Sequence, residues 1–281
     1  MLRRLLALTA SLAMILAACG DDEGTPSNGE GECGPGHPAL FEAGKLTVAT
    51  GDPVFPPWML DDNPAGGEGF ENSVVYAVAD ELGFDAGDVV WVRTSWEGAI
   101  APGAKDYDFN IQQYSITEDR REVVDFSTPY YSEEKVLVTF PDSPGADAQS
   151  LADIQGLRYG AMIGTTDLAY IEDVIGATDV AVFDELSDVF LAMEGRQIEA
   201  TVVGLPTALF ATAVQVPDAM IAGILPNSGG GEGLGMLFEK GSGFVTCVDQ
   251  ALAALDARGE LAALATRWLT SGEGEIPRLS E

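Results

Sequence analysis

Hydroxyl, acidic and guanidinium groups lie close together in the segment Ser115-Ile116-Thr117-Glu118-Asp119-Arg120. The segment reads as the end of a strand that turns into a short helix, with both acids in its first turn. That geometry presents the Ser115 hydroxyl, backbone N–H groups and the planar fork of Arg120 to one point. Each charge-assisted hydrogen bond there contributes about 1.5–3 kcal/mol. The pattern predicts an anion site suited to a carboxylate, and the alternative is a surface arginine paired with surplus acid.

The elements that must position this segment alternate between short apolar runs and helical patterns after residue 44, which favours α/β layering. The expected strands are Lys45–Thr50, Val89–Arg93, Phe109–Gln113, Val136–Phe140, Leu157–Met162, Val180–Phe183, Glu199–Val203, Met220–Leu225 and Gly235–Phe238. The expected helices are Val74–Leu82 with Ser73 as its cap, Asp167–Val174, Glu185–Glu194, Pro206–Val214 and Phe244–Arg258. Loop-like stretches around 141–149 and 226–233 divide the pattern. They predict two lobes, with a small-ligand cleft between them.

Composition excludes several functions. The chain has 281 residues, and 14 basic against 45 acidic residues give a formal net charge of −31, which disfavours nucleic-acid binding. A single histidine, His37, argues against a Ser-His-Asp triad or a multi-histidine metal site. Three cysteines are too few for a cysteine-rich zinc site. We therefore expect no metal and no cofactor.

The N-terminus has the pattern of a secretory signal. Two arginines precede an apolar run from Leu5 to Ala18, which is too short for a comfortable transmembrane helix. Leu16-Ala17-Ala18-Cys19 resembles the lipobox of bacterial lipoproteins, so Cys19 is the expected lipid attachment site. The protein would then be exported and anchored to the outer face of the cytoplasmic membrane by lipid alone, whereas an ordinary signal peptide would leave Cys19 incidental.

An acidic stretch rich in Gly and Pro follows, and residues 19–43 are expected to form a solvated tether. With Cys19 lipidated in an oxidising compartment, Cys33 and Cys247 remain as an even pair. A disulfide between them is our hypothesis, and two free thiols are the alternative.

Several motifs, in order, resemble the family 3 extracellular solute-binding proteins of ABC transporters, the polar amino-acid binding proteins, over residues 45–269. These motifs are Lys45–Asp52 followed by Phe55-Pro56-Pro57-Trp58, Gly69-Phe70-Glu71, Ser115-Ile116-Thr117 with Arg120, and Val124–Tyr131. The resemblance implies an α/β, type II periplasmic-binding-protein fold, whose two lobes are joined by two hinge strands. The expected division is signal peptide 1–18, tether 19–43, lobe 1 at 44–137 and 232–281, and lobe 2 at 138–231.

The resemblance also implies a ligand-binding set. Arg120 matches the arginine that clamps a ligand α-carboxylate, with Ser115 beside it, and Thr165 and Thr166 match the second lobe's contribution. The remaining members of the expected set are Asp52, Phe55, Trp58, Trp96, Gln113 and Gly204. The three aromatic residues in this set are equally suited to an ordinary core.

One departure from the family pattern concerns the ligand's ammonium group. Relatives commonly carry an Asp where this chain has Gly204, after the strand of lobe 2. A buried ammonium without a partner would be penalised by about 3–5 kcal/mol. Either Glu71, Glu97 or Asp52 replaces that Asp, or the ligand lacks a free α-amino group.

The resemblance therefore implies a non-enzymatic, monomeric binding protein that closes its lobes on a small carboxylate solute, an amino acid or a derivative, and delivers it to an ABC transporter permease. The alternatives are a dehydratase or lyase that uses a cleft carboxyl group as general acid, and a solute sensor without transport.

Overall fold

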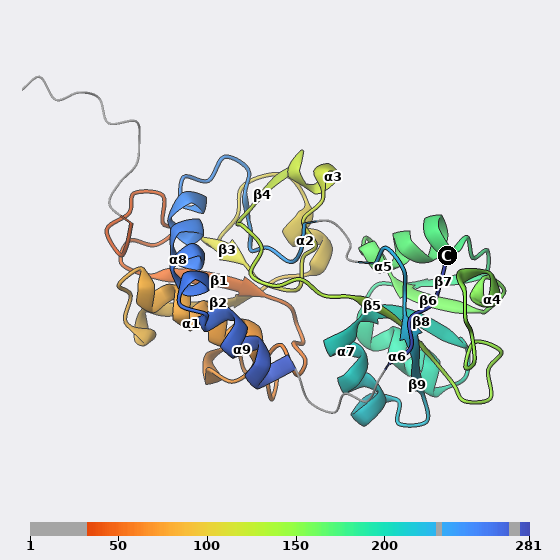
Figure 1. Cartoon of the computed structure of the whole chain (residues 1–281). Coiled ribbons are helices and arrows are strands. Elements are labelled where there is room, and N and C mark those ends of the chain that lie inside the picture. Colours follow the sequence, from red (N-terminus) through yellow and green to blue (C-terminus); the bar gives the residue numbers. More distant parts are fainter. Residues whose placement is uncertain (1–32, 229–231, 270–275) are drawn as a thin grey trace, which may run out of the picture. The chain divides into compact units, whose positions relative to one another are not determined.

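Two five-stranded sheets lie at the centre of the fold, and helices pack around both of them (Figure 1). The computed structural model describes residues 33–228, 232–269 and 276–281. The expected signal peptide, the lipid-attachment residue Cys19 and the first part of the expected tether lie outside the described residues. Two α/β sheets in one chain confirm the predicted two-lobed fold.

The first sheet combines strands from distant parts of the chain. Its strands are β1 (Leu46–Thr50), β2 (Val89–Arg93), β3 (Phe109–Asn110), β4 (Val124–Phe126) and β10 (Leu237–Glu239). Their order is β2-β1-β3-β10-β4, with β1 parallel to β2 and β3, and β10 antiparallel to β3 and β4. All of β1 is buried, as expected for a central parallel strand covered on both faces.

The helices of the first lobe are α1 (Phe70–Glu81), α2 (Trp96–Ile100), α3 (Glu118–Arg121), α8 (Val245–Ala257) and α9 (Glu260–Leu269). Helices α1, α8 and α9 pack together over the core beside β1 (Figure 1). The predicted start of α1 is wrong, because the cap is Gly69 and not Ser73. Gly69 has a φ of 115°, which favours glycine, and the Ser73 hydroxyl donates to its carbonyl at 2.7 Å.

The second sheet has the same mixed character. Its strands are β5 (Lys135–Thr139), β6 (Tyr159–Met162), β7 (Val180–Phe183), β8 (Ala200–Gly204) and β9 (Met220–Ile224). Its helices are α4 (Leu151–Ile154), α5 (Thr166–Ala169), α6 (Leu186–Glu194) and α7 (Leu205–Phe210), and α5 and α7 continue as the π-helical turns Tyr170–Ile175 and Ala211–Gln215. The strand order is β7-β6-β8-β5-β9, with β5 antiparallel to both of its neighbours.

Two hinge segments, residues 127–134 and 225–236, connect the sheets. Where they are described they run side by side, because the N–H of Tyr130 donates to the carbonyl of Leu234 at 2.9 Å and the N–H of Leu234 donates to that of Tyr131 at 2.8 Å. They match the two hinge strands that the family resemblance implies.

The lobe boundaries differ from the predicted ones in two places. Strand β5 begins at Lys135 and pairs only within the second sheet, so the boundary precedes residue 138. The C-terminal residues 276–281 also lie on the second sheet and not on lobe 1. There the Ile224 N–H donates to the Pro277 carbonyl at 2.8 Å, and the Leu279 N–H donates back to the Ile224 carbonyl at 2.9 Å.

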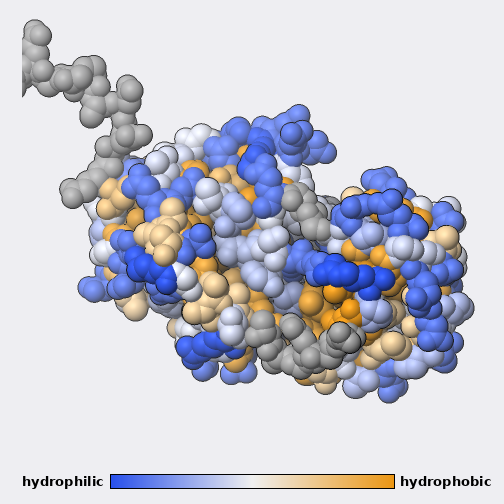
Figure 2. Space-filling view, in the orientation of Figure 1, coloured by the Kyte–Doolittle hydropathy of each residue, from blue (hydrophilic) through white to orange (hydrophobic). Residues whose placement is uncertain are grey.

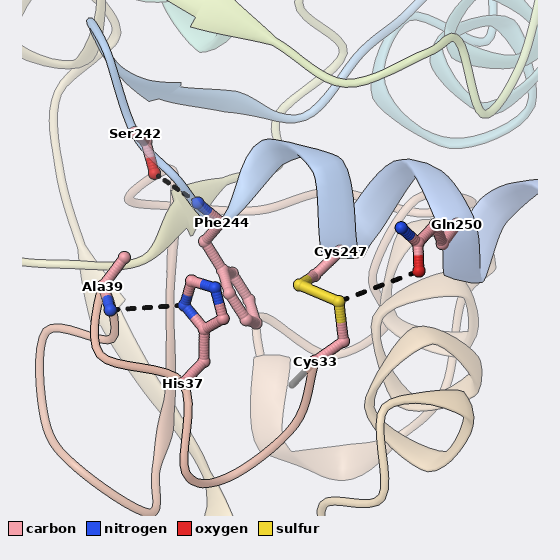
Figure 3. The surroundings of a disulfide bond; sticks show 7 residues. All are labelled: Cys33, His37, Ala39, Ser242, Phe244, Cys247 and Gln250. Carbon is pink, nitrogen blue, oxygen red and sulfur yellow. Dashed lines mark hydrogen bonds between the residues drawn. A yellow bond between two sulfur atoms is a disulfide. The ribbon is translucent and has the colours of Figure 1, made fainter. Parts of the chain in front are cut away.

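Residues 33–43 pack against the first lobe, which corrects the predicted extent of the tether. Cys33 and Cys247 form a disulfide that attaches this segment to α8 (Figure 3). The side chain of His37 is 4% exposed, and its ring lies 5.2 Å from that of Phe244. A bridge and a buried ring are incompatible with a solvated linker, so any tether ends before Cys33.

We expect the Cys33→Ser/Cys247→Ser variant to lose about 2–5 kcal/mol of unfolding free energy, because the bridge closes a loop of 214 residues in the unfolded chain. Denaturant titration with and without reductant measures the loss. Reductant should destabilise the wild-type protein alone, and equal midpoints for the wild-type protein and the variant would contradict a stabilising bridge.

Hydrophilic residues are spread over much of the visible face of the molecule (Figure 2). Such a surface accommodates most of the acidic excess without a compensating partner, because like charges in water are well screened. Among the helices that the structure describes, none combines the length and the apolar character needed to cross a bilayer.

Candidate functional site

A cavity of about 100 Å³ lies where elements of both sheets meet. From the first lobe, the wall takes residues of the loop after β1, the N-terminus of α2 and the segment after β3. From the second lobe, it takes residues of the turn before α5, the start of α6 and the end of β8, and the first hinge segment also contributes. From the predicted set they include Phe55, Trp96, Gln113, Ser115, Thr165, Thr166 and Gly204, whereas Asp52, Trp58 and Arg120 are not among them. Lining residues outside the predicted ligand-binding set include Gln112, Glu133, Lys135, Met162, Asp167, Glu185, Val203 and Thr207.

The hydroxyl groups predicted to bind an anion come together from the two lobes. Ser115 Oγ lies 3.1 Å from Thr166 Oγ1. The turn that supplies Thr166 contains Gly164, whose φ of 70° suits glycine, and the Thr165 side chain caps α5 by accepting the Leu168 N–H at 3.1 Å. Local sequence therefore fixes the second-lobe side of this site.

Arg120 is buried beside these hydroxyl groups, with 8% of its surface exposed. Its Nη1 donates to the Ser115 carbonyl at 2.7 Å, and its Nη2 donates to the Gly164 carbonyl of the other lobe at 2.9 Å. Burial is the main cause that lowers its pKa from the ordinary value. No carboxylate among the described residues forms an ion pair with it. The hydrogen bonds that hold the Arg120 guanidinium near the cavity therefore go to two backbone carbonyls.

Aromatic residues support the first-lobe wall. The Arg120 guanidinium lies 5.4 Å from the centroid of the Trp96 ring, which stacks on Tyr114 at 4.3 Å. Trp58 is only 2% exposed and belongs to the first-lobe core, but its Nε1 donates to Thr207 Oγ1 in the second lobe at 2.9 Å. Trp58 therefore joins the lobes without lining the cavity.

Glu71, one of the acids expected to replace the missing Asp, is engaged elsewhere. It is 1% exposed and accepts the backbone N–H of Gln113 at 2.8 Å, along with bonds from the Gln113 side chain and the Tyr130 hydroxyl. Burial is the main cause that raises its pKa to about 7. Gln113 has a φ of 51°, so this network also holds an unusual backbone conformation. The other two expected acids, Asp52 and Glu97, are exposed and outside the cavity wall.

The charged side chains that do line the cavity are Glu133, Lys135, Asp167 and Glu185. Lys135 Nζ donates to Thr166 Oγ1 at 3.0 Å and forms an ion pair with Asp167. The side chain of Lys135 is 5% exposed and that of Asp167 is 23% exposed, so the lysine end of the pair is buried. Asp167 directly follows the predicted turn, and Glu133 and Lys135 lie where the chain enters the second sheet. Only the exact position of the lobe boundary could have indicated Glu133 and Lys135 as residues of the site.

Gly204, at the end of β8, faces the first hinge segment. A Cβ built on Gly204 would overlap the carboxylate of Glu133, so the acid occupies the space of a side chain at position 204. Burial is the main cause that raises the pKa of Glu133 to about 8, while Lys135 lowers it and Asp167 and Glu71 raise it. Within the described ranges, no three His, Cys, Asp or Glu residues are grouped as metal ligands.

Comparisons with known proteins agree with this architecture. The family model of "Bacterial extracellular solute-binding proteins, family 3" matches residues 46–271. The chain is 24% identical to the L-cystine-binding protein TcyJ of Escherichia coli, over 81% of this chain and 83% of that protein. It is 25% identical to a "Probable histidine-binding protein" of Campylobacter jejuni, over 61% of this chain and 64% of that protein.

A solved structure, "An ancestral arginine-binding protein bound to glutamine", superposes with a TM-score of 0.68 at 26% identity and covers 81% of this chain and 98% of that one. The family model spans more than half of the chain, and the two mixed sheets agree with it. The chain belongs to the bacterial extracellular solute-binding proteins of family 3.

Proposed function

We propose that this protein captures a small carboxylate solute, an amino acid or a derivative of one, and delivers it to an ABC importer. The observation that carries the proposal is the buried guanidinium of Arg120, which has no carboxylate partner among the described residues and lies beside Ser115 and Thr166. A desolvated cation gains most from a bidentate carboxylate. The ligand would supply that carboxylate and replace the Gly164 carbonyl on Nη2.

Lobe closure is the proposed capture step. Four hydrogen bonds between described residues already join the lobes: Ser115 to Thr166, Arg120 to Gly164, Trp96 to Gly164, and Trp58 to Thr207. A solute that contacts both lobes binds the closed state better and shifts the population toward it. The named relatives bind L-cystine and, by its printed name, histidine, which supports an amino-acid ligand.

The proposed setting is outside the cytoplasm, with a lipid on Cys19 as the only membrane attachment and the permease of the importer as the protein partner. The proposed acting form is a monomer, and its role is binding and not catalysis. The family's extracellular character supports this setting.

A thermal-shift screen of the twenty standard L-amino acids, L-cystine and their decarboxylated amines tests the proposal. A ligand at 100 times its Kd stabilises the folded state by about 2.7 kcal/mol. For a domain of this size that corresponds to a rise in Tm of about 5–10 °C. We expect at least one amino acid to produce such a shift and its decarboxylated amine to produce none. Equal shifts for acid and amine would overturn the carboxylate assignment.

A further inference from the structure

Glu133, on the first hinge segment, has surroundings typical of a ligand-binding residue and not of a structural one. Glu133 lines the cavity, yet its Oε2 is closed to water and has no hydrogen-bond partner among the described residues. A buried carboxylate without a partner is costly, since burial penalises its charged form. The neighbouring Glu134 differs, because it accepts two hydrogen bonds from Arg278, at 2.6 and 2.9 Å.

The charged residues around Glu133 leave its carboxylate available to bind a cationic group in the cavity. Lys135 is the only basic residue in the cavity wall, as far as the structure describes it, and Asp167 already pairs with it. Even with Glu133 neutral, Asp167 and Glu185 against Lys135 leave the described wall with an excess of negative charge. An opposite charge inside the cavity would therefore be attracted, and among the acids of the described wall Glu133 has a buried oxygen without a hydrogen-bond partner.

The space over Gly204 explains why this acid comes from the hinge segment. A side chain at position 204 and the present position of the Glu133 carboxylate are mutually exclusive. Lys135, the first residue of β5, pairs with Gly204 of β8. Glu133 lies two residues before Lys135, on the first hinge segment, and its carboxylate lies over Gly204. The carboxylate at this position is therefore supplied by the hinge segment and not by β8.

We infer that Glu133 is the residue that binds the cationic amino group of the ligand, and that it makes a free α-amino group a requirement for tight binding. This inference rests on the proposed function, since it assumes a solute that carries both a carboxylate and an ammonium group. Gly204 left two alternatives open: another acid binds the ammonium group, or the ligand has no free α-amino group. The inference favours the first alternative, with Glu133 as the acid in place of Glu71, Glu97 or Asp52.

Calorimetric titration tests this assignment with the wild-type protein, Glu133→Gln and the matched control Glu134→Gln. The probes are the amino acid of the standard twenty plus L-cystine that gives the largest thermal shift, and its Nα-acetyl form. We expect the wild-type protein and Glu134→Gln to bind the free amino acid at least 100-fold more tightly than the acetyl form. Glu133→Gln should lose at least 30-fold for the free amino acid and less than threefold for the acetyl form.

Relocating the acid provides a second test that does not depend on loss of function. Gly204→Asp alone should weaken binding, because its side chain displaces the Glu133 carboxylate and places two acids in the space of one. The double variant Glu133→Gly/Gly204→Asp should recover affinity for the free amino acid to within tenfold of the wild-type protein. Circular dichroism and melting curves establish that each variant is folded.

The outcomes separate this inference from the proposed function. Amino-acid binding that Glu133→Gln weakens no more than Glu134→Gln does would overturn the role of Glu133 and leave solute binding intact. Equal affinity of the wild-type protein for free and acetylated ligands would do the same. A wild-type protein that binds no amino acid of the panel would overturn the proposed function and this inference with it.

Discussion

The affinity of the wild-type protein for its amino acid should rise about 50-fold between pH 6 and pH 8, and then level off. Burial raises the pKa of Glu133 to about 8, so the free protein carries a neutral acid at this position below that pH. An ammonium ligand binds the carboxylate form, and binding must therefore release a proton. The fraction of the free protein with a charged Glu133 is about one half at pH 8 and about 1% at pH 6, which gives the stated rise.

The other charged groups near Glu133 do not reverse this sign. Lys135 favours its charged form, whereas Asp167 and Glu71 favour the neutral one, and Glu133 in turn raises the pKa of Tyr130. Burial raises the pKa of Glu71 to about 7, so Glu71 also titrates between pH 6 and pH 8. Its carboxylate accepts hydrogen bonds from Gln113 and Tyr130 and is therefore engaged away from the ligand.

Titration calorimetry at pH 6, 7 and 8, in buffers of different ionisation enthalpy, measures both the affinity and the released proton. Glu133→Gln serves as the control, because it retains Glu71 and every other titrating group. Its affinity should be weak and nearly independent of pH. A wild-type affinity that stays level or falls toward pH 8 would contradict a neutral Glu133 in the free protein.

The alternation of apolar runs was sufficient to predict the layering, because it reflects burial within each element. Every predicted strand overlaps an observed one, and Val89–Arg93 and Val180–Phe183 have the same bounds. Strand β4 is missing from the prediction since three residues with Asp125 in the middle carry no strand pattern of their own. Its position as the edge strand beside β10 is set by tertiary pairing.

The candidate site was predictable where one local segment builds it. Ser115 and Arg120 follow one strand and begin one helix, so their proximity is a property of the local chain. Glu133 is different, because its contact with Gly204 depends on the register between β5 and β8. Sequence spacing carries no information on that register. Because Glu133 is followed by two further charged residues, Glu134 and Lys135, its sequence context is typical of an exposed surface residue.

The packing of residues 33–43 was missed for a similar reason. Their Gly, Pro and acidic composition is typical of a solvated linker. The disulfide to α8 and the contact of His37 with Phe244 override that composition, and both involve partners about 200 residues away in the chain. The cysteine count predicted the pair but not the consequence that the segment folds onto the lobe.

Arg120→Ala should weaken amino-acid binding at least 100-fold while the protein stays folded. The substitution removes the bond from Nη2 to the Gly164 carbonyl of the other lobe and the positive charge beside Ser115 and Thr166. Two charge-assisted bonds to a carboxylate contribute about 3–6 kcal/mol together, so a loss of 100-fold or more follows. Arg120→Lys should recover part of the affinity, because it keeps the charge but loses the planar fork.

Arg121→Ala is the matched control for this prediction. Arg121 is the next residue on α3, yet its guanidinium is half-exposed and makes both of its side-chain bonds to Glu232, each at 2.7 Å. Exposed pairs of this kind contribute about 0–1 kcal/mol, so affinity should change less than threefold. Comparing each variant's affinity for the amino acid and for its decarboxylated amine isolates the carboxylate. The wild-type preference for the acid should vanish in Arg120→Ala and persist in Arg121→Ala. A preference that survives in Arg120→Ala would place the ligand carboxylate against Lys135, the basic residue that the structure describes in the cavity wall.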